Sequence, residues 1–397
     1  MGLFGDPFKF CNNEREKQQW NNSENLKAEK VIAEKSIVLL KNENHLLPLS
    51  KQILPTDRKA KSIALIGPFM KAVRDNLGFW SYSWPDDSVR IVSQFQGIKN
   101  KVGAPAKLLY AKGCDINDSS QAGFAEAIDA AMQADVVIMS LGEASDWSGE
   151  AKSRSNLHLP GVQEELVKTI YALGKPVIVM INAGRPLIFN WTADHVAAIL
   201  YTWWLGTDAG DAIADVLFGD YNPSAKLPMS FPRAEGQIPI YYNHYNTGRP
   251  ATSDSDRFYR SAYIDLSIYP KFPFGFGLSY ANFSYSSIRL SHPTMKPTQP
   301  ITATVTVTNN GNYDGEETVQ LYLQDMVGSV VRPVKELKGF KKIFLKKGES
   351  EQVSFTIDVN KLKFYNSQLK YVYEPGDFKV FIGGNSQDVQ QASFKVE

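Results

Sequence analysis

Hydrophobic residues in the first two thirds of the chain form short continuous runs that alternate with helical periodicities. The runs SIALIGP, ADVVIMS, PVIVMINA and HVAAILYTWW are rich in β-branched residues, which is typical of strands covered on both faces. The segments AGFAEAIDAAMQA, VQEELVKTIYAL and AGDAIADVLFG have apolar residues at helical spacing and lie before, between or after these runs. This order predicts an α/β domain over residues 31–233, with a mostly parallel sheet sandwiched by helices.

Beyond residue 300 the pattern changes to strict alternation in short segments. ITATVTVTN, ETVQLYLQD, ELKGFKKIFLK, SEQVSFTID, DFKVFIGG and ASFKVE are separated by turn sequences such as NGNYDG, KKGE and EPGD. Strands at this spacing predict an all-β sandwich of immunoglobulin or fibronectin III type over residues 300–397. We expect one inward face to contain Val305, Val307, Val319, Leu321 and Leu323.

Two segments carry weaker patterns. Residues 1–30 lack a clear period until a helix with an apolar stripe begins near Asn25, and we interpret them as a linker. Residues 234–299 lose the helical period and gain Tyr, Pro and Gly, which indicates a connector that crosses over other domains. The predicted order is therefore linker, α/β domain, connector and sandwich.

Charge and composition exclude several classes of partner. Lys and Arg total 43 against 42 Asp and Glu, a net charge of +1, which disfavours nucleic acid and anionic membranes. The chain has no run of eighteen apolar residues, and its N-terminus turns polar and acidic too early for a secretory signal. The compartment is left open. Cys11 and Cys114 are interpreted as two free thiols.

The stretch LGEASDWSGEAKSRSNLHLP, residues 141–160, follows a predicted buried strand and precedes a helix. In open α/β sheets, loops at the carboxyl ends of parallel strands converge on one crevice. We therefore predict an active-site loop whose rim is shared by Glu143, Asp146, Glu150 and Arg154.

Carboxylate chemistry is the reaction type that this loop favours. The five histidines show no pair at metal-ligand spacing, no G-x-S-x-G elbow is present, and the GxG of FGFGLSY does not open a helix. No metal or cofactor is expected. A Glu beside apolar surface gains proton affinity and can protonate a leaving group, and Trp147 could supply such a surface for Glu150. The alternative is that these acids only solvate a surface loop.

Long blocks of the chain resemble one family. KSIVLLKNENHLLPL, ADVVIMSLGEASDWSGEAKSRSNLHLP, GKPVIVMINAGRPL and FGDYNPSAKLPMSFPR are similar in order and spacing to the C-terminal α/β-sandwich domain of glycoside hydrolase family 3, the β-glucosidase and β-xylosidase type. RPVKELKGFKKIFLKKGES and EPGDFKVFIGGNS resemble the fibronectin type III-like module that ends many of these enzymes. The resemblance covers essentially the whole chain.

The resemblance implies a retaining hydrolysis of β-linked oligosaccharides or glycosides by two carboxylates about 5 Å apart. An Asp attacks the anomeric carbon, and a Glu protonates the leaving oxygen and later deprotonates water. That general acid/base falls on Glu150. Trp147 and Arg154 become candidate substrate-binding residues, although we favour a structural role for Arg154 and leave loop packing open for Trp147. Glu143 is interpreted as an acceptor that braces the loop.

The chain departs from the family pattern in one respect. The family's nucleophile belongs to an N-terminal (β/α)8 barrel, which we expect to be absent here because MGLFGDPFKF resembles the segment that leaves the barrel. Ser145, Asp146 and Trp147 spell a tripeptide like that around the nucleophile, and we interpret this match as chance. The chain is thus expected to be a fragment or split part that is inactive without its barrel, or alternatively a barrel-less carbohydrate-binding or scaffold protein. Relatives are often periplasmic or secreted.

Overall fold

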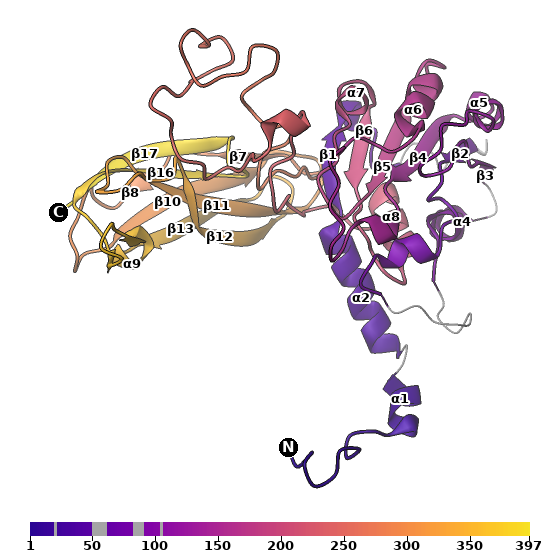
Figure 1. Ribbon diagram of the computed structural model, residues 1–397, viewed down its shortest axis with the longest axis horizontal. Helices are drawn as coiled ribbons and strands as arrows, with labels where there is room; N and C mark the ends of the chain where they lie inside the picture. The colour runs from indigo at the N-terminus through magenta and orange to yellow at the C-terminus, as the bar shows by residue number, and fades with distance from the viewer. Residues whose placement is uncertain (20–21, 50–61, 82–90, 104–105) are drawn as a thin grey trace.

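The computed structural model describes residues 1–19, 22–49, 62–81, 91–103 and 106–397. Residues 50–61, 82–90 and 104–105 of the predicted α/β domain, and residues 20–21 of the predicted linker, lie outside the described residues. Figure 1 shows an α/β unit and a β-sandwich side by side, with the N-terminus extending away from both.

A six-stranded sheet forms the centre of the described α/β unit, in the order β1-β6-β5-β4-β2-β3. Its strands are Val38–Asn42 (β1), Ser62–Ile66 (β2), Lys107–Ala111 (β3), Val136–Gly142 (β4), Val177–Asn182 (β5) and Ala198–Tyr201 (β6). Neighbouring strands pair in parallel, except that β1 runs antiparallel to β6 at one edge. The predicted α/β fold with a mostly parallel sheet is therefore confirmed.

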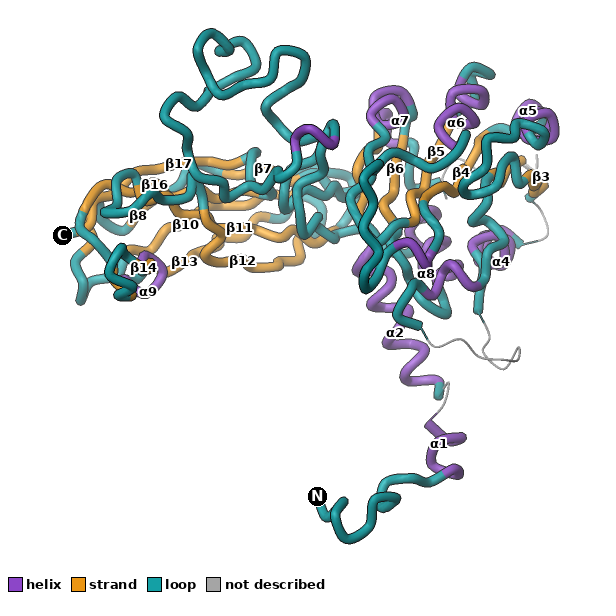
Figure 2. The backbone as a smooth tube through the Cα atoms, in the orientation of Figure 1, coloured by secondary structure: helices purple, strands orange, loops and turns teal. Residues whose placement is uncertain are grey.

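Helices cover both faces of this sheet, as the figures show (Figures 1 and 2). The longer helices of the unit are Ser23–Ser36 (α2), Gln94–Val102 (α4), Phe124–Met132 (α5), Gln163–Tyr171 (α6), Asn190–His195 (α7) and Ala209–Phe218 (α8). One apolar cluster joins α5, α6 and α7 to the sheet, and a second joins α2, α4 and α8 to the opposite face. The close approach of α4 to α8 requires glycine, because a Cβ on Gly97 would stand 2.1 Å from the carbonyl carbon of Gly210.

Two strands of this sheet did not emerge from the hydrophobic pattern. β1 follows α2 after a single residue, and it ends in Lys41 and Asn42, so its apolar run is short. β3 is an edge strand whose residues are mostly only half-buried. A half-buried edge strand such as β3 has a weaker apolar pattern than the central strands, whereas the buried part of β1 is only three residues long.

The C-terminal unit is the predicted β-sandwich, in which the strand pairs are antiparallel except for β9 with β17. One sheet has the order β13-β10-β7 with β8 also on β10, and the other has the order β12-β11-β16-β17-β9. The bounds are Phe283–Tyr285 (β7), Arg289–Leu290 (β8), Thr294–Met295 (β9), Ile301–Asn309 (β10), Gly315–Asp325 (β11), Glu336–Leu345 (β12), Ser350–Ile357 (β13), Gly376–Gly383 (β16) and Val389–Val396 (β17). Val359–Leu362 (α9) and the pair Phe364–Tyr365 (β14) and Tyr371–Val372 (β15) lie at one end.

The predicted inward face of the sandwich is confirmed, since all five of its residues are buried in one apolar cluster. β11 is covered on its other face too, because Tyr322 is fully buried and its ring lies 5.7 Å from that of Tyr242 in the connector. The connector also pairs with the segment after α8 through hydrogen bonds from Leu227 N to Phe276 O and from Phe231 N to Phe272 O, both 2.8 Å. In Figure 2 the connector is the loop that rises over the sandwich.

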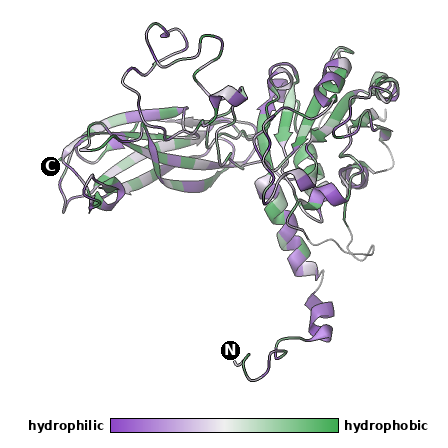
Figure 3. Ribbon diagram, viewed as in Figure 1, coloured by the Kyte–Doolittle hydropathy of each residue, from purple (hydrophilic) through white to green (hydrophobic). Residues whose placement is uncertain are grey.

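The N-terminal segment makes few contacts with the rest of the molecule. A short helix, Asn13–Gln19 (α1), has no buried residue, and the preceding Phe4 and Phe8 side chains are exposed. Figure 3 shows α1 as mostly hydrophilic, in contrast to the hydrophobic strands of the central sheet. Cys11 is exposed and Cys114 is buried, and both are free. Within the described ranges, the helices are too short or too polar to cross a lipid bilayer.

The buried position of Leu321 allows a test of the sandwich register. Leu321→Asp places an unpaired charge in the core, and we expect it to unfold the sandwich, because the penalty of several kcal/mol approaches the whole stability of a domain. Gln352→Asp on the exposed face of β13 is the matched control. Calorimetry should show a lost or strongly lowered transition only for the Leu321 variant, and an unmoved transition would refute the register.

Candidate active site

The loop after β4 lies at the point where the strand order of the sheet reverses direction. β4 pairs with β2 on one side and with β5 on the other, while the chain passes from β2 outward to β3. Ligand crevices in open α/β sheets form at the carboxyl ends of strands at such a switch point. The loop after β2 supports the loop after β4 here, because Asp75 Oδ1 accepts a 2.9 Å hydrogen bond from Ser145 N.

A buried carboxylate anchors the beginning of the loop. Glu143 is fully buried, and its two oxygens accept hydrogen bonds from Arg154 Nη1 at 2.8 Å and from Arg185 Nε at 3.1 Å. Arg154 comes from the same loop, and Arg185 comes from the turn after β5. A buried charge is tolerated only when it is paired and hydrogen-bonded, so the loop and the turn are held against one another.

Arg185 also fixes the loop on either side of Glu150. Its Nη2 donates to the carbonyl oxygen of Trp147 and, at 2.6 Å, to that of Lys152. Between these two points the chain makes a tight turn, in which Ala151 has a left-handed φ of 57° and Lys152 N donates to Gly149 O at 3.3 Å. Glu150 lies at the tip of this turn and is exposed. Its backbone is thus constrained while its side chain faces solvent.

Gly149 allows the turn to lie close to the loop after β2. A Cβ at this position would stand 2.1 Å from Cδ1 of Phe79, so any larger residue would push the turn away. Lys152 Nζ lies 5.8 Å from the centre of the same Phe79 ring. The loops after β2, β4 and β5 therefore meet around the turn that carries Glu150.

The predicted sugar-binding pair, Trp147 and Arg154, are neighbours in space. The guanidinium carbon of Arg154 lies 5.1 Å from the centre of the Trp147 ring, within the range of a cation–π contact. Both line an open cavity of about 440 Å³ together with Asn117, Asn156 and His158. Arg154 Nη2 also donates to His158 O at 3.2 Å.

A buried polar network lies beneath the loop, at the carboxyl ends of the central strands. Asn182 at the end of β5 donates to Ser140 Oγ at 2.9 Å and accepts from Gln94 Nε2 at 2.8 Å and from Thr202 Oγ1 at 3.1 Å. Gln163 at the start of α6 exchanges two 2.8 Å hydrogen bonds with the backbone of Gly142. Such satisfied networks make the base of a site rigid.

The geometry agrees with part of the rim predicted from the sequence. Asp146 and Glu150 are exposed on one loop, but Glu143 lies beneath the loop and not on its rim. Its two arginine partners agree with the predicted role of a bracing acceptor. Arg185 was missed, although its place directly after a buried strand was a usable signal.

Glu235 was also missed, because it belongs to the connector and no motif marks it. Its carboxylate accepts a 2.9 Å hydrogen bond from Leu157 N, and its other oxygen lies 3.7 Å from His158 Nε2. The backbone contact and the nearby His158 lower the pKa of Glu235 against the opposing effect of partial burial. The connector therefore holds the far end of the loop.

No group of three or more metal-binding side chains gathers anywhere in the described part of the chain. The side chains of this loop include carboxylate, guanidinium, amine, hydroxyl, amide, imidazole and indole groups.

Comparison with known proteins gives two family matches. Residues 37–280 match the glycosyl hydrolase family 3 C-terminal domain, and residues 317–386 match a fibronectin type III-like domain. The chain is 45% identical over 420 aligned residues to a periplasmic β-glucosidase of Salmonella typhimurium, covering 100% of this chain and 54% of that protein. It is 42% identical to a β-xylosidase of Formosa agariphila, covering 92% of this chain and 49% of that protein.

A solved structure is similar throughout. A mutant β-glucosidase from Listeria innocua in complex with laminaribiose superposes with a TM-score of 0.90 at 37% identity, covering 100% of this chain and 53% of that one. The same enzyme has also been solved with glucose, where the TM-score is 0.89. The chain thus spans about half the length of the relatives that it matches.

The arginine contacts predict an order of stabilities. Arg185→Ala should lower the free energy of unfolding by about 3 kcal/mol, because Glu143 loses a partner and two loop carbonyls lose a donor. Arg154→Ala should cost roughly 1.5 to 2 kcal/mol, since it releases only one other carbonyl. Lys168→Ala, which breaks an exposed pair with Glu165, should cost about 0 to 1 kcal/mol.

Denaturant unfolding measures these differences, and amide hydrogen exchange of residues 147–152 reports on the loop. Exchange should accelerate most in the Arg185 variant. Equal costs for Arg185→Ala and Lys168→Ala would contradict the role of Arg185 as the clamp of this loop.

Proposed function

We propose that this chain, which belongs to glycoside hydrolase family 3, supplies the general acid/base of a retaining β-glycosidase through Glu150. The observation that carries the proposal is the clamp on either side of this residue. Arg185 holds the carbonyl groups of Trp147 and Lys152, so the backbone is fixed while the Glu150 carboxylate is exposed. A proton donor must keep such a defined position relative to the leaving oxygen.

In this mechanism Glu150 protonates the glycosidic oxygen as the bond to the anomeric carbon breaks, and later removes a proton from the attacking water. The nucleophile must be a second carboxylate about 5 Å away. Glu143 is unsuitable, because both of its oxygens are engaged by arginines and the side chain is fully buried. We assign the nucleophile to an Asp of a (β/α)8 barrel, as the family resemblance implies.

The substrate would be a terminal β-linked sugar of an oligosaccharide or glycoside. Relatives include β-glucosidases and β-xylosidases, and the sugar preference would depend on the barrel. Trp147 and Arg154 line the open cavity beside the loop and could contact the substrate there. Their mutual cation–π contact also supports a structural role for Arg154.

We also propose a role for each segment of the chain. Residues 31–233 form the domain that carries Glu150, residues 234–299 connect it to the sandwich of residues 300–397, and residues 1–30 lead from the barrel. The exposed Phe4 and Phe8 of that leading segment, and the exposed Ile32 of α2, are apolar surface that a barrel could cover.

Reconstitution tests the catalytic assignment. We expect the 397-residue chain alone to release little product from an aryl β-glucoside, and a mixture with a separately expressed family barrel to be active. Glu150→Gln should reduce the activity of the mixture by roughly 10² to 10⁴-fold. The loss should be smaller for a substrate whose leaving group is a weak base, because such a group needs less protonation.

Asp146→Asn is the matched control, since it removes an exposed carboxylate of the same loop only four positions away. It should leave the activity nearly unchanged. Comparable losses in both variants would argue against Glu150 as the acid/base. An inactive mixture whose parts demonstrably associate would favour a non-catalytic binding or scaffold function.

A further inference from the structure

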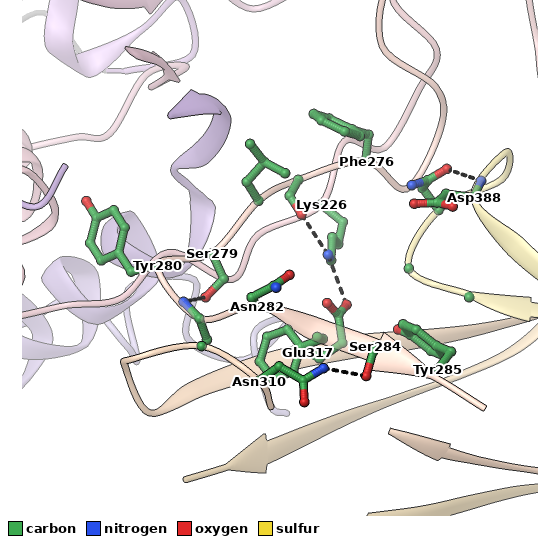
Figure 4. A pocket seen from close by; sticks show the side chains of 18 of the residues that line it. Lys226, Phe276, Ser279, Tyr280, Asn282, Ser284, Tyr285, Asn310, Glu317 and Asp388 are labelled. Atoms are coloured by element: carbon green, nitrogen blue, oxygen red, sulfur yellow. Dashed lines mark hydrogen bonds and ion pairs between the residues drawn. The ribbon is translucent and has the colours of Figure 1, made fainter. Parts of the chain in front are cut away.

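A second cavity, of about 960 Å³, lies where the connector meets the α/β unit and the sandwich (Figure 4). None of its lining residues belongs to the loop of residues 143–160. Its polar side chains come from segments far apart in the sequence. The ones that matter here are Lys226 after α8, Asn282 and Tyr285 at β7, Glu317 on β11 and Asp388 before β17.

The charges in this cavity compensate one another. Lys226 Nζ lies 2.9 Å from Glu317 Oε1 and donates to Gly277 O at 2.7 Å. Only 15% of the Lys226 side chain and 9% of the Glu317 side chain are exposed. Asp388 and Lys347 add one charge of each sign to the lining. A bound molecule would therefore meet no net charge, which favours an uncharged ligand over an ion.

Hydrogen-bonding capacity in the cavity is not used up by the protein. The Tyr285 hydroxyl is buried, yet it has no hydrogen-bond partner among the described residues. Burial raises the pKa of this hydroxyl, and the nearby Glu317 and Asp388 carboxylates raise it further. The Asn282 amide, which is exposed to solvent, adds a further donor and acceptor to the lining. A buried polar group without a partner is costly unless a ligand satisfies it.

Gly384 lies beside both Tyr285 and Glu317. A Cβ built on Gly384 would stand 3.6 Å from the Tyr285 hydroxyl and 3.7 Å from Glu317 Oε1, both ordinary contact distances. Phe276 and Tyr313 add aromatic surface to the same lining. The cavity thus offers acceptors, a hydroxyl, an amide and ring faces within one volume of the size typical for ligand sites.

We propose that this cavity is a carbohydrate-binding site for an uncharged saccharide of one or two sugar units. Sugar hydroxyls both donate and accept, so they can bond the Glu317 and Asp388 carboxylates as donors and satisfy the Tyr285 hydroxyl as acceptors. The C–H face of a pyranose packs on aromatic rings. A divalent cation fits less well, because Lys226 already occupies one carboxylate. The inference does not depend on the catalytic role of Glu150.

Calorimetric titration of the full chain with cellobiose tests the proposal. Tyr285→Phe removes only the unpaired hydroxyl, so the thermal midpoint should stay unchanged or rise while binding weakens roughly three- to tenfold. Gly384→Val should place methyl groups against the Tyr285 hydroxyl and the Glu317 carboxylate and abolish binding. Gly376→Val, elsewhere in the sandwich where a Cβ meets only one atom at 3.9 Å, should bind normally.

Trp147→Ala removes the ring beside the Glu150 loop, so cellobiose binding that persists in this variant but is lost in Gly384→Val belongs to the second cavity. Binding that is lost in Trp147→Ala but retained in Gly384→Val and Tyr285→Phe would overturn the proposal. So would the absence of cellobiose binding at millimolar concentration. A parallel titration with calcium chloride completes the test, because a calcium response that depends on Glu317, without a cellobiose response, would assign the cavity to a cation instead.

Discussion

The buried carboxylate of Glu143 is the interaction on which the candidate site depends. A charge removed from water is tolerated only with close and well-oriented partners. Its two guanidinium partners come from the loop after β4 and from the turn after β5, so the two carboxyl-terminal ends of neighbouring strands are tied together. Arg185 also donates to the carbonyl groups on either side of Glu150. The pairing of the buried Glu143 charge therefore also fixes the backbone around the exposed Glu150.

The contacts between the α/β unit and the sandwich follow the same logic. Lys226 and Glu317 form a largely buried pair across the junction, and Lys342 of β12 donates to Ser224 at 2.7 Å in the segment after α8. Gln320 of β11 donates to Gly275 O of the connector at 3.1 Å. Polar contacts with directional geometry fix the relative orientation of the two units more precisely than apolar packing alone. These contacts fix the connector at the junction. From there the connector contacts the Glu150 loop through the hydrogen bond from Leu157 N to Glu235.

The parts of this structure that could be predicted are those in which a segment's own pattern decides its conformation. The central strands and the alternating strand β10 satisfy that condition, since the buried face of Val305 and Val307 is visible in the sequence itself. The strands β7, β8 and β9 span only two or three residues and exist because a partner strand is present. Likewise Glu143 could be interpreted as a bracing acceptor from its place in the loop, whereas its partner Arg185 lies 42 residues away. That pairing depends on the register of β4 against β5, which local patterns do not reveal.

The exposure of Glu150 sets a physical condition on the proposed chemistry. A carboxylic acid holds its proton at neutral pH when apolar surface covers it and excludes water. Trp147 was the candidate for that cover in the sequence, but its ring is engaged by the Arg154 guanidinium in the structure. The cover would then have to come from the surface that docks over the carboxyl ends of the strands. Under the proposed function the barrel has two tasks at this point: it brings the nucleophile, and it creates the dry environment in which Glu150 can act as an acid.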